Sequence, residues 1–188
     1  MRFISSALAV FAFALSANAI TSECQGISAS VTVCNNHITA MTKELPTIIE
    51  LLTSFTSADG IDGGLKIYNI VEPIQKLMET ARKECCVDFG TVTVDDAQSV
   101  VDTVKPVISQ IVTALDITSQ KKEDFDRLII ATEIAQDVIK GFYSGTKAMT
   151  TCISDAGSTS QPSFIPIIND YVSQIDNAFL NAKKVYGF

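Results

Sequence analysis

The chain has 188 residues, of which 47% are hydrophobic and 7% aromatic, and its formal net charge at neutral pH is −7. An acidic surface repels the phosphates of nucleic acids, so we expect no nucleic-acid partner. The chain has a single histidine, His37, and its five cysteines do not follow the spacing of zinc ligands, so we expect no metal and no other cofactor.

The first 19 residues have the pattern of a secretory signal peptide. Arg2 is followed by a mostly apolar run from Ile4 to Leu15, and Ala17-Asn18-Ala19 matches a cleavage site. A membrane anchor is the alternative, but a helix needs about 20 apolar residues to span a bilayer, and no later run is that long. We therefore expect a secreted protein with one domain, residues 20–188, and no transmembrane segment.

The stretch from Ile27 to Phe55 carries the clearest helical pattern. Its apolar residues recur in alternating steps of four and three, at Ile27, Val31, Cys34, Ile38, Met41, Leu45, Ile48, Leu52 and Phe55. Such a stripe is typical of a long helix that packs against other helices. The pattern predicts a first helix over residues 21–56, kinked at Pro46 because proline lacks a backbone donor.

Four more amphipathic helices are expected, at residues 65–86, 93–117, 119–154 and 164–186. Thr93 and Asp96 resemble a capping box at the start of the third. The core face of the fourth is expected to hold Phe125, Leu128, Ile129, Ala135, Val138, Phe142, Met149 and Cys152. A glycine-rich loop at 57–64 and a polar linker at 154–162 should separate helices. Five such helices predict an all-α antiparallel bundle.

Secretion places the cysteines in an oxidising compartment, so disulfides are expected. In an up-and-down bundle, the heights along the helices bring all five cysteines to one end. We expect two bridges that join Cys85 and Cys86 to Cys34 and to either Cys152 or Cys24; partial oxidation of the adjacent pair is the alternative. Cys24 and Cys34 cannot pair while both are helical, because ten residues of helix span about 15 Å.

The apolar stripes also predict where an interior space would lie. Pro46, Pro73, Pro106 and Gly141 fall at one height along their helices, so kinks there would let the helices bow apart. A filled core is the alternative. The residues expected to line the space and bind an apolar ligand are Leu45, Leu52, Ile74, Leu77, Val104, Ile111, Val138, Phe142, Ile175 and Phe179.

The sequence contains no catalytic constellation. A Ser-His-Asp triad would have to be built around His37, which lies on the flank of an apolar stripe. The neighbouring Asp95 and Asp96 are expected to cap a helix rather than to act as a general acid and base. We therefore expect a non-enzymatic protein.

Several short segments are similar to those of a known family. They are Asp62-Gly63-Gly64-Leu65, then Leu115 followed by Lys121-Lys122 and Phe125, and Val185-Tyr186 near the C-terminus. In these features the chain resembles the fungal hydrophobic surface-binding protein A family, which includes antigenic cell-wall galactomannoproteins. Five cysteines depart from the typical members, which have few.

The resemblance implies a helical bundle, secretion or residence in the cell wall, and binding of hydrophobic surfaces or fatty-acid-like lipids. It also implies a secreted polyester-degrading esterase as a partner. Two alternatives stay open: an inhibitor of the invertase and pectin methylesterase inhibitor type, which a Cys24–Cys34 bond would favour, and an effector or antigen with a protein target.

Overall fold

The computed structural model describes residues 27–86 and 91–188. The expected signal peptide, Cys24 and residues 87–90 lie outside these ranges. The helices are α1 (Ala29–Thr42), α2 (Leu45–Ser54), α3 (Gly60–Cys85), α4 (Val94–Gln120), α5 (Lys122–Asp126), α6 (Ala131–Ser160) and α7 (Ile165–Tyr186), with short 3-10 turns η1 (Ser57–Asp59) and η2 (Pro162–Phe164). The described residues form no strand, so the all-α prediction is confirmed.

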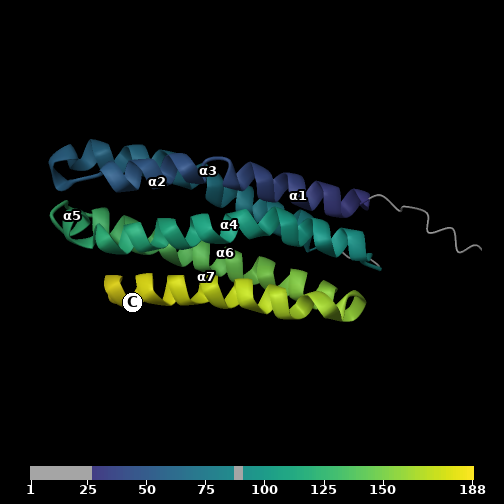
Figure 1. Ribbon diagram of the computed structural model, residues 1–188. Coiled ribbons are helices and arrows are strands. Elements are labelled where there is room, and N and C mark those ends of the chain that lie inside the picture. Colours follow the sequence, from purple (N-terminus) through teal and green to yellow (C-terminus); the bar gives the residue numbers. More distant parts are fainter. Residues whose placement is uncertain (1–26, 87–90) are drawn as a thin grey trace, which may run out of the picture.

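The helices lie side by side along one long axis and form five rods (Figure 1). The first rod consists of α1 and α2, and another consists of α5 and α6. The main contacts join α1 to α3, α3 to α6, α6 to α7, α7 to α4, and α4 back to α1 and α2. The rods therefore close into a ring around a central axis.

The first predicted helix is interrupted just before Pro46. The α-helices end and restart around Lys43 and Glu44, which keep helical backbone angles, and α2 begins with Pro46 in its first turn. Proline is well tolerated there because the first backbone N–H groups of a helix have no intrahelical acceptor. The apolar stripe continues across the break, since Met41 and Leu45 are both buried.

The loop expected at 57–64 is instead helical. Thr56 and Asp59 form a capping box, in which the Thr56 N–H donates to Asp59 Oδ2 at 2.8 Å. Gly60 has a φ of 64°, and α3 runs on from it through Gly63. The glycine is needed there because this backbone conformation is rarely adopted by residues with a side chain. α3 also continues without a break through Pro73.

The predicted fourth helix is split by a turn at Arg127–Ile130. This turn places Phe125 over the end of α2, where its ring stacks on Phe55 with centroids 4.8 Å apart. Ile130, which precedes α6, has a φ of 64°. A left-handed conformation is unfavourable for a β-branched residue, so tertiary contacts must stabilise it.

The polar linker expected at 154–162 is also wrong over most of its length, because α6 continues to Ser160. The end of α6 packs against α7 at Gly157, since a Cβ at this position would lie 3.4 Å from Ile168 of α7. The Gln161 side chain then donates to the Val92 carbonyl at 2.9 Å, which anchors the turn into α7. The final predicted helix, 164–186, agrees with α7 within one residue.

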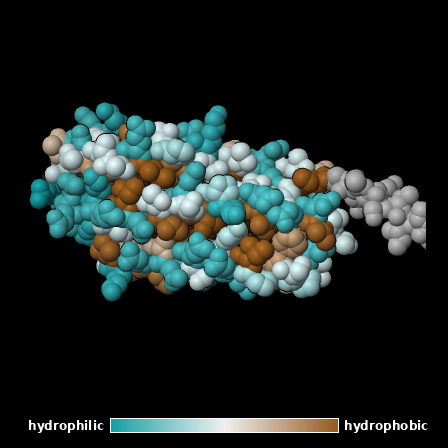
Figure 2. Space-filling view, in the orientation of Figure 1, coloured by the Kyte–Doolittle hydropathy of each residue, from teal (hydrophilic) through white to brown (hydrophobic). Residues whose placement is uncertain are grey.

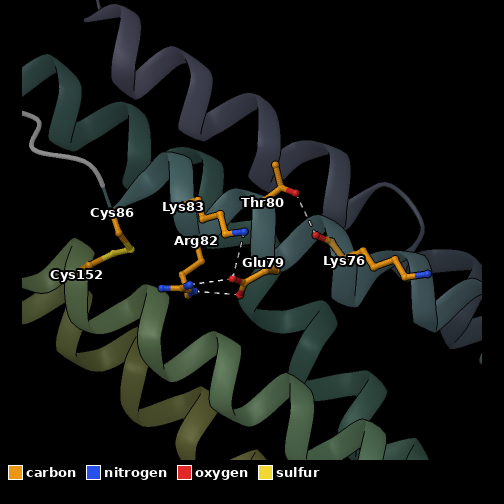
Figure 3. Close-up of polar contacts among 7 residues, drawn as sticks. All are labelled: Lys76, Glu79, Thr80, Arg82, Lys83, Cys86 and Cys152. Atoms are coloured by element: carbon orange, nitrogen blue, oxygen red, sulfur yellow. Dashed lines mark hydrogen bonds and ion pairs between the residues drawn. A yellow bond between two sulfur atoms is a disulfide. The ribbon is translucent and has the colours of Figure 1, made fainter.

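Two disulfides join α3 to its neighbours. Cys34 of α1 pairs with Cys85, and Cys86 pairs with Cys152 of α6. The second bond is visible in Figure 3, near the exposed ion pair between Glu79 and Arg82. The predicted bridging of the adjacent cysteines is thus confirmed, with Cys152 and not Cys24 as the second partner.

Asp96 connects the start of α4 to the start of α1. It forms the predicted capping box with Thr93, and its Oδ1 accepts the Ser28 N–H at 2.7 Å, where α1 begins. Burial alone raises the pKa of Asp96, but the hydrogen bonds from Ser28 and Thr93 outweigh it and lower that pKa below its ordinary value. The folded protein therefore favours the ionised carboxylate.

We expect Asp96→Ala to lower the free energy of unfolding by about 1–3 kcal/mol at pH 7, because two N–H groups lose their acceptor. A group with a lowered pKa stabilises the fold above the pKa of the unfolded chain, and this stabilisation disappears as the pH falls through the folded pKa. The difference in free energy of unfolding between the wild type and Asp96→Ala should therefore become smaller in acid. Urea denaturation at pH 7 and below pH 4 measures it, with exposed Asp95→Ala as the control; equal losses at both positions would contradict the assignment.

Candidate functional site

A cavity of about 250 Å³ lies along the axis of the ring. Its walls include residues of all five rods, from Ile38 on α1 to Phe179 on α7. Helices packed in pairs can interdigitate across a shared core, whereas five rods in a ring leave the side chains of opposite rods too far apart to fill the axis. The ring is therefore the physical cause of the space.

The lining is almost entirely aliphatic and aromatic. None of the described residues that line the cavity is charged, and none is an amide. Its threonines are engaged: Thr42, Thr118 and Thr150 donate to carbonyl groups of their own helices, and Thr146 donates to the sulfur of Met78. Tyr68 and Tyr171 also reach the wall, and the remainder of the lining is apolar surface that favours hydrocarbon.

The structure brings nine of the ten predicted residues together in the cavity wall. They are Leu45, Leu52, Ile74, Val104, Ile111, Val138, Phe142, Ile175 and Phe179. The exception is Leu77, which packs against the outside of the core and does not line the cavity. Contact of any of the ten with a ligand stays a prediction.

The sequence pattern wrongly predicts Leu77 in the cavity wall because α3 offers two overlapping apolar stripes. One contains Ile70 and Leu77, and the other contains Val71 and Met78, one residue further along. Neighbouring positions differ by about 100° around a helix, so the pattern alone does not choose between them. In the structure Val71 and Met78 are the buried pair.

Two glycines of α6 mark the closest approach of α3. A Cβ on Gly141 would lie 2.9 Å from the Gln75 side chain, and one on Gly145 would clash with the end of Met78. Gly141 therefore lies against a side chain of α3, and the bow expected at this height stays a prediction. The cavity exists without a break in α3 at Pro73 or in α4 at Pro106.

The exposed part of the cavity wall lies at one end of the bundle. It consists of Ile61 and Leu65 on the first turns of α3 and of Ile129 and Ile130 in the turn before α6. Ile129 was expected to face the core, but it is 82% exposed. Helical periodicity failed there because the turn at Arg127–Ile130 interrupts the helix.

On the α4, α6 and α7 side, this end of the bundle is closed by Tyr186. Its hydroxyl donates to the Thr118 carbonyl at 2.9 Å, and its own carbonyl accepts from Gln136 Nε2 at 2.8 Å. Burial raises the pKa of Tyr186 above its usual range, so the phenol stays protonated and keeps donating. The exposed lining residues of this end lie on the other side, at the start of α3 and in the turn before α6.

The outer surface of the bundle mixes polar and apolar groups. On the face shown in Figure 2, hydrophobic residues reach the surface in several separate places between hydrophilic ones. In the described ranges, no helix combines the length and hydropathy needed to cross a bilayer. The same residues hold no group of acidic, histidine or cysteine side chains suited to a metal ion.

The fold and the site define a class: an all-α bundle whose rods enclose an apolar cavity. No family model and no curated protein matches the sequence. One solved structure has a similar fold: AfMP4p, determined in complex with palmitic acid, aligns with a TM-score of 0.74 over 84% of this chain and 99% of AfMP4p. At 17% sequence identity, this similarity establishes a shared fold.

Proposed function

We propose that this protein is a secreted, non-enzymatic lipid-binding protein that holds a fatty-acid-like chain inside its helical ring. The observation that carries the proposal is the cavity, whose lining is uncharged and mostly apolar among the described residues. The palmitic acid bound by AfMP4p, which has the same fold, supports a fatty acid as the ligand. Burying a hydrocarbon chain in such a site is favourable by about 0.8 kcal/mol for each methylene group.

The finer parts of the proposal rest on the sequence. Secretion follows from the signal peptide pattern, and the absence of enzymatic activity is inferred from the lack of a catalytic constellation around His37. Membership of the hydrophobic surface-binding protein A family, adhesion to hydrophobic surfaces, a place in the cell wall and an esterase partner all rest on the resemblance described above. The pairing of Cys34 with Cys85 argues against the inhibitor alternative, which favours a Cys24–Cys34 bond.

Native mass spectrometry of the secreted protein tests the proposal directly. We expect lipid of one or a few chain lengths to be released from the purified protein, and we expect the lipid-free form to take up a fluorescent fatty acid. A protein that carries no lipid and takes up no probe would overturn the proposed function.

A variant that fills the cavity provides the mechanistic test. Ala135 lines the cavity from α6, so Ala135→Phe should occupy the space of the ligand while the bundle stays folded. We expect probe affinity to fall by at least about tenfold, which corresponds to about 1.4 kcal/mol. Ala40→Phe, on the exposed face of α1, is the matched control and should bind as the wild type does.

A further inference from the structure

The described cavity wall offers no charge to balance a charged head group, and its hydroxyl groups are those of four threonines and of Tyr68 and Tyr171. A carboxylate or phosphate drawn into an apolar site without a partner loses its hydration, at a large free-energy cost. The lining threonines already donate to carbonyl groups or to Met78, and the described lining residues include no cation. A charged head group therefore finds no counter-charge in this wall and is favoured in water.

The exposed apolar end of the cavity wall offers a place for the head group beside solvent. Ile61, Leu65, Ile129 and Ile130 are exposed and also line the cavity, so the apolar wall continues from the interior to solvent at this end. Gly64 lies among them, and a Cβ at this position would meet no atom within 4 Å. We call these five residues the mouth.

The interior is long enough for a single chain. On α3 the lining residues run from Ile61 to Met78, a rise of about 25 Å along the helix. This length suits an extended long acyl chain.

We infer that a single-chain lipid enters tail first through the mouth and leaves its polar head group outside, so that chain length and not head-group chemistry decides binding. This inference rests on the proposed function and adds the orientation and the class of ligand. Free fatty acids, fatty alcohols and lysophospholipids of equal chain length belong to that class.

A competition experiment on the full secreted protein tests the orientation. A fluorescent fatty acid is displaced by palmitate, hexadecanol or palmitoyl-lysophosphatidylcholine, each below its micellar concentration, and by octanoate. The first three should agree within about threefold in apparent Kd, and octanoate should be weaker by more than about a hundredfold because it buries fewer methylene groups. The bulky lysophospholipid head is the decisive case, since it cannot enter the cavity.

Two variants locate the mouth. Gly64→Trp places a large side chain in open space and should weaken all three long-chain ligands by at least about tenfold. Ala40→Trp, on the exposed face of α1 and away from the cavity wall, is the control and should stay within about twofold of the wild type. Circular dichroism confirms that both variants are folded.

The outcomes are distinct. Displacement by palmitate but not by the lysophospholipid would overturn the inference and leave the proposed function intact, because the head group would then be enclosed. Unchanged binding by Gly64→Trp would also overturn it, by placing the entrance elsewhere. Failure of the wild type to bind the probe at all would overturn the proposed function, and the inference with it.

Discussion

Replacing Cys34 and Cys85 together by alanine is expected to lower the free energy of unfolding by about 4 kcal/mol. The bond joins residues 51 apart in the sequence, so its loss returns considerable conformational freedom to the unfolded chain. Both cysteines are fully buried between α1 and α3, so their removal also leaves a small void. Urea denaturation followed by circular dichroism measures the loss under non-reducing conditions.

The second disulfide supplies the matched comparison. Cys86 and Cys152 are 66 residues apart but only partly buried, so replacing both by alanine should cause a loss of about 4 kcal/mol with little added packing cost. The pair at Cys34 and Cys85 should therefore show the larger loss. If the double variant of Cys34 and Cys85 unfolds at the same urea concentration as the wild type, the bond between these two cysteines does not form.

Phe179→Ala is expected to destabilise the bundle by about 3–5 kcal/mol, although Phe179 also lines the cavity. The side chain is 1% exposed, and its ring lies 5.3 Å from that of Tyr143, so it supports the junction of α6 and α7. Its removal creates space that the surrounding helices fill only in part. Chemical denaturation gives the loss, and probe uptake below the denaturation midpoint shows whether binding changes with it.

Phe142→Ala is the control for this prediction. Phe142 lines the same cavity but is partly exposed, so its truncation removes less buried area and should destabilise the protein by less. We expect the truncation of Phe179 to enlarge the cavity and to leave uptake of a fatty-acid probe detectable. A loss of uptake in folded Phe179→Ala, with full stability, would show that this ring acts through the ligand and not through packing.

Much of the candidate site could be predicted from periodicity, but its entrance could not. Residues such as Ile74, Ile175 and Phe179 recur on one face of a helix, and that face had to turn inward because its apolar area is unfavourable in water. Ile61 and Ile129 lie at helix ends. Their environment depends on the capping box at Thr56 and Asp59 and on the turn at Ile130, which place them on the surface.

By itself, the sequence determined where the main helical segments run, most of their inward faces and the cysteines that can meet, because each follows from a repeat of 3.6 residues and a rise of about 1.5 Å for every residue. Only the tertiary structure decided that five rods close into a ring with an open axis, that α3 turns Met78 and not Leu77 toward it, and that the mouth lies beside Gly64. These outcomes depend on which side chains from distant parts of the chain share one volume, and local periodicity carries no information about that volume.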